Sequence, residues 1–81
     1  MIKNEINKYI KLKKETDKIE KDLENGIVVD EKYIDKIYDD YLMARNEIIK
    51  FIMINLKVSI DKANLLFYTR QDEVLDILKN M

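Results

Sequence analysis

The chain has 81 residues and a formal net charge of −1, and it contains no histidine, cysteine or tryptophan. This length predicts a single helical domain over residues 1–81, and the missing residue types exclude imidazole bases, thiol nucleophiles, disulfides and the common zinc and iron–sulfur sites. The near-neutral charge also lacks the basic excess that holds many proteins to nucleic acid by neutralising phosphates.

The first predicted element is an amphipathic helix over about residues 2–25. Apolar side chains recur along it at helical spacing, which places them on one face. Asn25-Gly26 is expected to end this helix, because glycine adopts the left-handed conformation of a helix C-terminus at low cost. The residues of the apolar face are Ile2, Ile6, Tyr9, Leu12, Thr16, Ile19 and Leu23.

A second helix is predicted over about residues 31–56, with Asp30 as its N-cap. Joined to the first by a short connection, it forms a long antiparallel hairpin. Its apolar arc covers about 180° of the helix at about 100° per residue, and Met43 and Ile54 fall outside even that arc. A helix with one neighbour needs a narrower stripe. The C-terminal part of the chain can cover some of this arc, and we expect a second copy of the chain to cover the rest, so that the protein is a homo-oligomer.

Two short C-terminal helices, at about residues 60–67 and 70–80, complete the predicted fold, which is all-α. Ser59 is placed to cap the first, and Thr69 with Asp72 has the spacing of a capping box for the second. The expected buried residues are Ile60, Ala63, Leu66 and Phe67 in the first, and Val74, Ile77, Leu78 and Met81 in the second.

The chain offers little for catalysis, and we predict no enzyme, no cofactor and no metal site. Its single serine, Ser59, has no histidine to activate it, and its single glycine cannot build a phosphate-binding loop. Glu31, Asp35 and Asp39 lie one turn apart at the start of the second helix. We interpret them as a solvated helix start, with an acidic stripe for a basic partner or a weak metal site as the alternative.

Lysines line the first helix opposite its apolar face. Read as a functional feature, this ridge would bind nucleic-acid backbone or another anionic partner. Acidic residues one turn away compensate much of its charge, so we favour a solvated surface. The ridge consists of Lys3, Lys11, Lys14, Lys18 and Lys21.

Two groups of residues are candidates for binding another protein. Tyr38, Tyr41 and Arg45 lie on the apolar arc of the second helix, and tyrosine and arginine are enriched at binding hot spots. A structural role for Arg45 inside the monomer is the alternative. Leu65 and Tyr68 point away from the predicted core face of the third helix and form a second candidate patch.

The segment from Val58 to Lys79 resembles the helix-turn-helix of small transcription regulators and excisionases in its apolar spacing, which implies DNA binding. It departs from that pattern in two places. Tyr68 stands at the turn position where glycine is usual. Acidic residues would face the phosphates from the second short helix, namely Asp72, Glu73 and Asp76.

The sequence therefore predicts a small protein-binding module without catalysis, a regulator, adaptor or inhibitor that docks on a larger protein of unidentified kind. The alternative is a DNA-binding regulator that uses residues 58–79. The chain is rich in isoleucine, lysine, asparagine and tyrosine, which have AT-rich codons. This composition and the small size suit an accessory protein of a phage or mobile element. We expect a cytoplasmic location, because the most apolar run, residues 51–56, is far shorter than the ~20 residues of a membrane span and the N-terminal residues lack the apolar core of a signal peptide.

Overall fold

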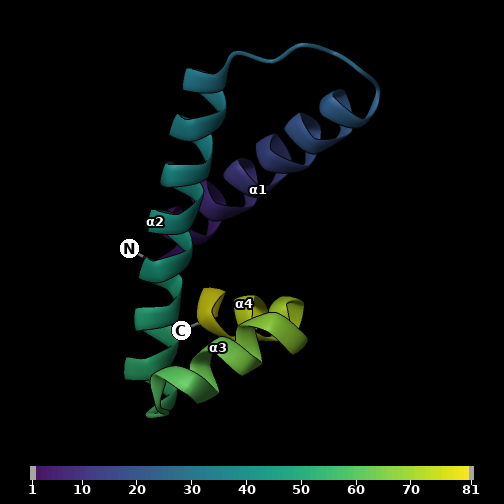
Figure 1. Ribbon diagram of the computed structural model, residues 1–81. Helices are drawn as coiled ribbons and strands as arrows, with labels where there is room; N and C mark the ends of the chain where they lie inside the picture. Colours follow the sequence, from purple (N-terminus) through teal and green to yellow (C-terminus); the bar gives the residue numbers. More distant parts are fainter. Residues whose placement is uncertain (1, 81) are drawn as a thin grey trace.

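The computed structural model describes residues 2–80, and these residues form four helices and no strand (Figure 1). Of the described residues, 86 % are helical. The prediction of an all-α fold with a long helix pair and two short C-terminal helices is confirmed, and each predicted bound lies within one or two residues of the observed one. The helices are α1 (Ile2–Glu24), α2 (Glu31–Leu56), α3 (Ile60–Thr69) and α4 (Gln71–Lys79).

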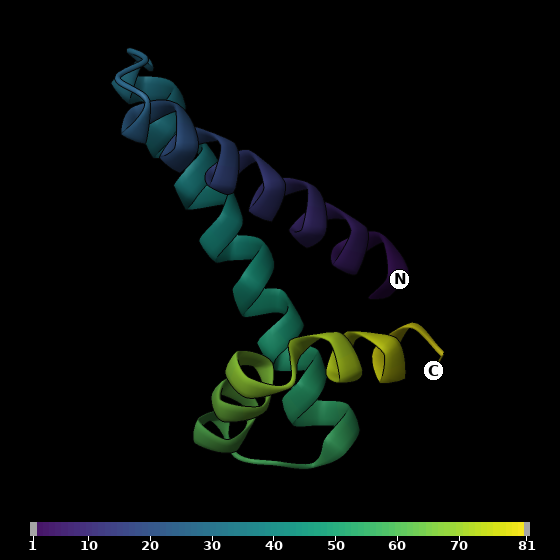
Figure 2. The same ribbon diagram turned by 90° about the vertical axis from the view of Figure 1, so that its right-hand side faces the viewer.

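The long helices α1 and α2 run in opposite directions and cross obliquely. Their ends beside the connecting loop are spread apart in Figure 1, and their other ends are spread apart in Figure 2. The short helices α3 and α4 pack at the C-terminal end of α2, where α4 also contacts α1. The molecule is therefore elongated, with extents of 43 × 23 × 18 Å.

One hydrophobic core lies where all four helices meet. Ile6, Ile48 and Ile52 are fully buried in it. Complete burial of such a side chain contributes about 1.5–3 kcal/mol, so these three isoleucines hold α1 and α2 to the shorter helices. The buried residues of the cluster are Ile6, Tyr9, Leu12, Ala44, Ile48, Ile49, Ile52, Ala63, Phe67, Val74, Leu75 and Leu78.

The helix ends follow local backbone chemistry. Gly26 has φ 76°, its N–H donates to the carbonyl of Leu23, and the next N–H donates to the carbonyl of Asp22 at 2.8 Å. This pair of bonds is the Schellman arrangement, and it confirms the predicted stop. Ser59 caps α3 as predicted, since its Oγ accepts the N–H of Lys62 at 3.2 Å. Asp30 occupies the N-cap position of α2 without a side-chain cap bond.

The predicted capping box at the start of α4 is wrong. Thr69 is the last residue of α3, and its Oγ1 donates to the carbonyl of Leu65 at 2.8 Å. The N-cap of α4 is Arg70, which makes no side-chain cap bond. Because α3 continues two residues beyond its predicted end, Thr69 lies inside α3, and Arg70 takes the N-cap position of α4 instead.

Three apolar side chains that were predicted to face the core are instead about half exposed: Leu23, Ile60 and Ile77. Leu75 is buried where Ile77 was expected, because α4 turns the face with Val74, Leu75 and Leu78 toward the core. Met81, the fourth residue predicted to be buried there, lies outside the described residues. Within residues 2–80, no helix is long and apolar enough to cross a membrane.

Candidate functional site

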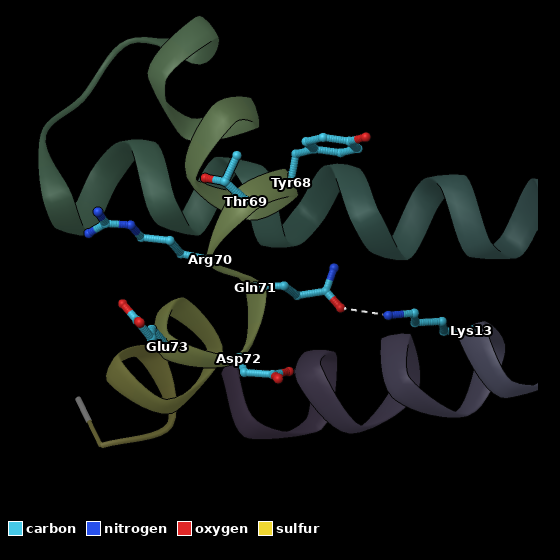
Figure 3. Close-up of a pocket in the computed structure, with 7 residues that line it drawn as sticks. All are labelled: Lys13, Tyr68, Thr69, Arg70, Gln71, Asp72 and Glu73. Carbon is cyan, nitrogen blue, oxygen red and sulfur yellow. Dashed lines mark hydrogen bonds between the residues drawn. The ribbon is translucent and has the colours of Figure 1, made fainter.

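A cleft of about 260 Å³ opens where α1 and α2 meet the junction of α3 and α4. We call it the tyrosine–arginine cleft. It adjoins a hollow of about 400 Å³ at the α3–α4 junction, and both share Lys13, Tyr68 and Gln71 (Figure 3). In Figure 3 these three side chains lie on one side of the junction, while Arg70 extends away on the other. The lining residues of the cleft are Tyr9, Lys13, Tyr41, Arg45, Phe67, Tyr68 and Gln71.

Three aromatic rings form the floor of the cleft. Tyr9, on the apolar face of α1, is buried and stacks on Tyr41 of α2 with ring centroids 5.4 Å apart. Phe67 of α3 meets the Tyr9 ring edge-on at 5.2 Å. Both geometries are favourable for aromatic pairs, so the rings fix the positions of the hydroxyl groups above them.

A chain of hydrogen bonds crosses the cleft from α1 to α4 and back. The Lys13 ammonium donates to Gln71 Oε1 at 2.9 Å, and Gln71 Nε2 donates to the Tyr9 hydroxyl at 3.0 Å. Lys13 thus orients the amide so that its NH₂ group faces Tyr9. The Tyr9 and Tyr41 hydroxyls are 3.4 Å apart. Either hydroxyl can be the donor in this pair. When Tyr9 donates to Tyr41, the O–H group of Tyr41 remains available to a ligand.

The phenol of Tyr9 stays protonated well beyond neutral pH. Burial raises its pKa above the ordinary value of 10.0, and the hydrogen bond with Tyr41 raises it further. The Tyr9 hydroxyl is therefore a permanent hydrogen-bond donor in the floor of the cleft and cannot serve as a base.

Arg45 has only uncharged partners. Its Nη2 donates to Asn64 Oδ1 at 3.2 Å, and its guanidinium carbon lies 5.6 Å from the centre of the Phe67 ring. Lys13 likewise bonds to a neutral amide, and no acidic residue lines the cleft. The cleft therefore presents two positive charges. Asp72 and Glu73 line the adjoining hollow beside Lys13, but within residues 2–80 neither forms an ion pair with it.

This arrangement suits the binding of anions. A guanidinium, an ammonium and tyrosine hydroxyls are hydrogen-bond donors, and donors of this kind converge on anions. The lining residues include no nucleophile paired with a general base. Among residues 2–80, no cluster of three His, Cys, Asp or Glu side chains is placed to hold a metal ion.

The structure brings together three of the five residues predicted to bind a partner. Tyr41, Arg45 and Tyr68 line the cleft. Tyr38 lies nearer the connecting loop, where its hydroxyl donates to Glu20 Oε1 at 3.2 Å. Leu65 is exposed on α3 but does not line the cleft. Each of the two patches expected from the sequence therefore contributes part of its residues to the cleft: Tyr41 and Arg45 from the first, and Tyr68 from the second.

Four cleft residues were not among the predicted binding residues. Tyr9 and Phe67 were assigned to the core, which they also occupy. Lys13 carried a usable signal, because it lies four residues after Tyr9 and so shares the inward face of α1 while the lysine ridge lies outside it. The sequence gives no comparable signal for Gln71, because its position in the cleft depends on where α4 packs.

The junction of α3 and α4 departs from a helix-turn-helix. One residue, Arg70, separates the two helices, whereas that motif uses a turn of about three or four residues. Tyr68 lies inside α3, so its predicted place in the turn is wrong. On α4, Asp72, Glu73 and Asp76 are exposed.

The chain matches no protein-family model, no curated protein and no solved structure. Its function must therefore be inferred from the residues of the cleft.

Proposed function

We propose that this protein is a non-enzymatic recognition module, acting as a regulator, adaptor or inhibitor, that binds an acidic segment of a larger protein in the tyrosine–arginine cleft. One observation carries the proposal. Lys13 and Arg45 both face the cleft, and both have only neutral hydrogen-bond partners. A carboxylate of the partner supplies the missing charge.

Arg45 is the expected centre of recognition. Its bond to Asn64 uses one of five N–H groups, so the guanidinium keeps donors for a carboxylate. The Phe67 ring and Asn64 already restrict the side chain, which lowers the entropy that binding removes. An arginine held in this way combines charge with a fixed direction of hydrogen bonding.

Tyr68 supplies the exposed part of the site. Its side chain is 87 % exposed at the rim of the cleft. Tyrosine buries a large area on binding and adds a directed hydroxyl, and such residues dominate many interfaces. The ring is placed to cover a peptide seated over Arg45.

The DNA-binding alternative has weaker support. The exposed acids of α4 would repel phosphates, and the single-residue junction limits how far α4 can project into a groove. The cleft, at about 260 Å³, has room for one or two side chains and not for a duplex backbone.

The test is the affinity of a fluorescently labelled, acetylated oligoglutamate peptide, measured by anisotropy at low salt. Tyr68→Ala and Lys13→Gln should each weaken binding about fivefold or more, the range of an interface hot spot. Lys18→Gln removes the same charge from the opposite side of α1 and should leave the affinity unchanged.

Two outcomes would contradict the proposal. Equal binding of an oligolysine peptide would show that the cleft does not select anions. Equal weakening by Lys13→Gln and Lys18→Gln would show that only the overall charge matters. Tight, sequence-dependent binding of duplex DNA that is lost in Arg70→Ala would establish the alternative function instead.

A further inference from the structure

One side of α2 is exposed, with Glu5 and Lys8 of α1 at its border. Ile48, Ile49 and Ile52 turn inward to α1, α3 and α4, so most of the broad apolar arc is buried within one copy of the chain. The exposed side instead presents Met43 and Ile54, which are 67 % and 72 % exposed. They lie eleven residues apart, or about three helical turns, and thus share one face.

Charged residues alternate with these two apolar side chains in an ordered way. Glu47 lies in the N-terminal half of this segment and Lys50 in its C-terminal half, between the two apolar side chains. Glu47 and Lys50 form an exposed ion pair at 3.4 Å within the chain. We call this face the α2 stripe, consisting of Met43, Glu47, Lys50 and Ile54.

We propose that two copies of the chain associate through the α2 stripe, with their α2 helices antiparallel about a two-fold axis. The axis meets α2 at the level midway along the helix between positions 48 and 49. Met43 then lies opposite Ile54 of the partner subunit. The same register places Glu47 opposite Lys50 of the partner subunit. Every apolar residue of the stripe then meets an apolar residue, and every acid meets a base.

The pattern selects this orientation over the parallel one. In a parallel pair each residue meets its own copy, so glutamate would face glutamate and lysine would face lysine. Like charges in register repel, and the antiparallel register converts the two charges of each chain into attractive pairs. The stripe is therefore complementary to itself in one direction only.

The interface is small and leaves the tyrosine–arginine cleft open. From Met43 to Ile54 the stripe is about 17 Å long at about 1.5 Å per residue, which is short for a stable interface. The dimer is consequently in equilibrium with the monomer. Tyr41 and Arg45 lie on the other side of α2, so each copy keeps its cleft accessible and the proposal does not depend on the proposed function.

Sedimentation velocity over micromolar to millimolar protein concentrations tests this association. Glu47→Lys and Lys50→Glu should each weaken the dimer about tenfold, because two attractive pairs become repulsive. An equimolar mixture of the two variants should recover the wild-type affinity, since one chain then carries two bases and the other two acids at the matching positions. Circular dichroism checks that each variant keeps its helices.

A second pair of variants separates this surface from exposed apolar surface in general. Met43→Glu should abolish the dimer, whereas Val28→Glu, at a position 95 % exposed in the connecting loop, should leave it unchanged. A wild-type protein that stays monomeric at millimolar concentration would overturn the proposal. A mixture of Glu47→Lys and Lys50→Glu that associates no better than either variant alone would overturn the antiparallel register.

Discussion

Tyr9 has the largest of the fully buried side chains and also holds the central hydroxyl of the tyrosine–arginine cleft. Its ring belongs to the core that joins α1 to α3, while its oxygen contacts Gln71 and Tyr41. Tyr9 therefore contributes both to the stability of the fold and to the shape of the cleft.

Removing only this hydroxyl should destabilise the protein measurably. Tyr9→Phe keeps the ring but leaves the Gln71 amide without its acceptor, and the expected loss is about 1–2 kcal/mol in the free energy of unfolding. Urea denaturation measures it. Tyr68→Phe, at an exposed position without a recorded hydrogen bond, is the control and should change stability by less than about 0.5 kcal/mol. Equal losses in the two variants would contradict the role of the buried chain of hydrogen bonds.

Alkaline pH should destabilise the fold through the same residue. Burial raises the pKa of Tyr9 above 10.0 in the folded state, so the unfolded chain loses this proton at a lower pH than the folded one. The contribution of Tyr9 to stability is therefore complete below pH 10.0 and declines as the pH rises toward the folded-state pKa. Urea midpoints should fall above pH 10.0 in the wild type and fall less in Tyr9→Phe. An identical decline in both proteins would assign the effect to other groups.

At the scale of the helices, the N-terminal caps can be ranked from their hydrogen bonds. Ser59 accepts the N–H of Lys62 at the start of α3, and Ser59→Ala should lower the free energy of unfolding by about 1 kcal/mol. Thr69 donates back into α3 and caps nothing. Thr69→Ala should therefore have a smaller effect, since alanine also has the higher helix propensity. A larger loss for Thr69→Ala, measured by the same denaturation, would restore the capping box that the sequence pattern predicts.

Helix positions were predictable because the chain has one glycine, no proline and regular apolar spacing. It was harder to predict which face each short helix turns toward the core. In α4 both Leu75 and Ile77 fit a helical apolar face with Val74 and Leu78, and only packing against the longer helices selects Leu75. Propensity and periodicity describe a helix by itself, whereas the choice between two such residues depends on its neighbours.

At the scale of the whole molecule, the cleft exists because α1 crosses α2 obliquely and the α3–α4 junction fills the angle (Figure 2). Tyr41, Arg45 and Tyr68 could be selected from the sequence by residue type and position on their helices. Lys13 and Gln71, which are fifty-eight positions apart, meet only through this crossing. No spacing rule within a helix can predict a contact between residues so distant in sequence.

Anion binding in the tyrosine–arginine cleft can be tested directly by a titration followed by ¹H–¹⁵N nuclear magnetic resonance. Unlabelled oligoglutamate peptide is added to labelled protein, and both backbone amides and the side-chain signals of Arg45 and Gln71 are followed. We predict that the shifted signals cluster on residues lining the cleft, with the lysine ridge of α1 unaffected. Shifts spread along Lys11, Lys14 and Lys18, with those of Arg45 and Gln71 unchanged, would contradict the account.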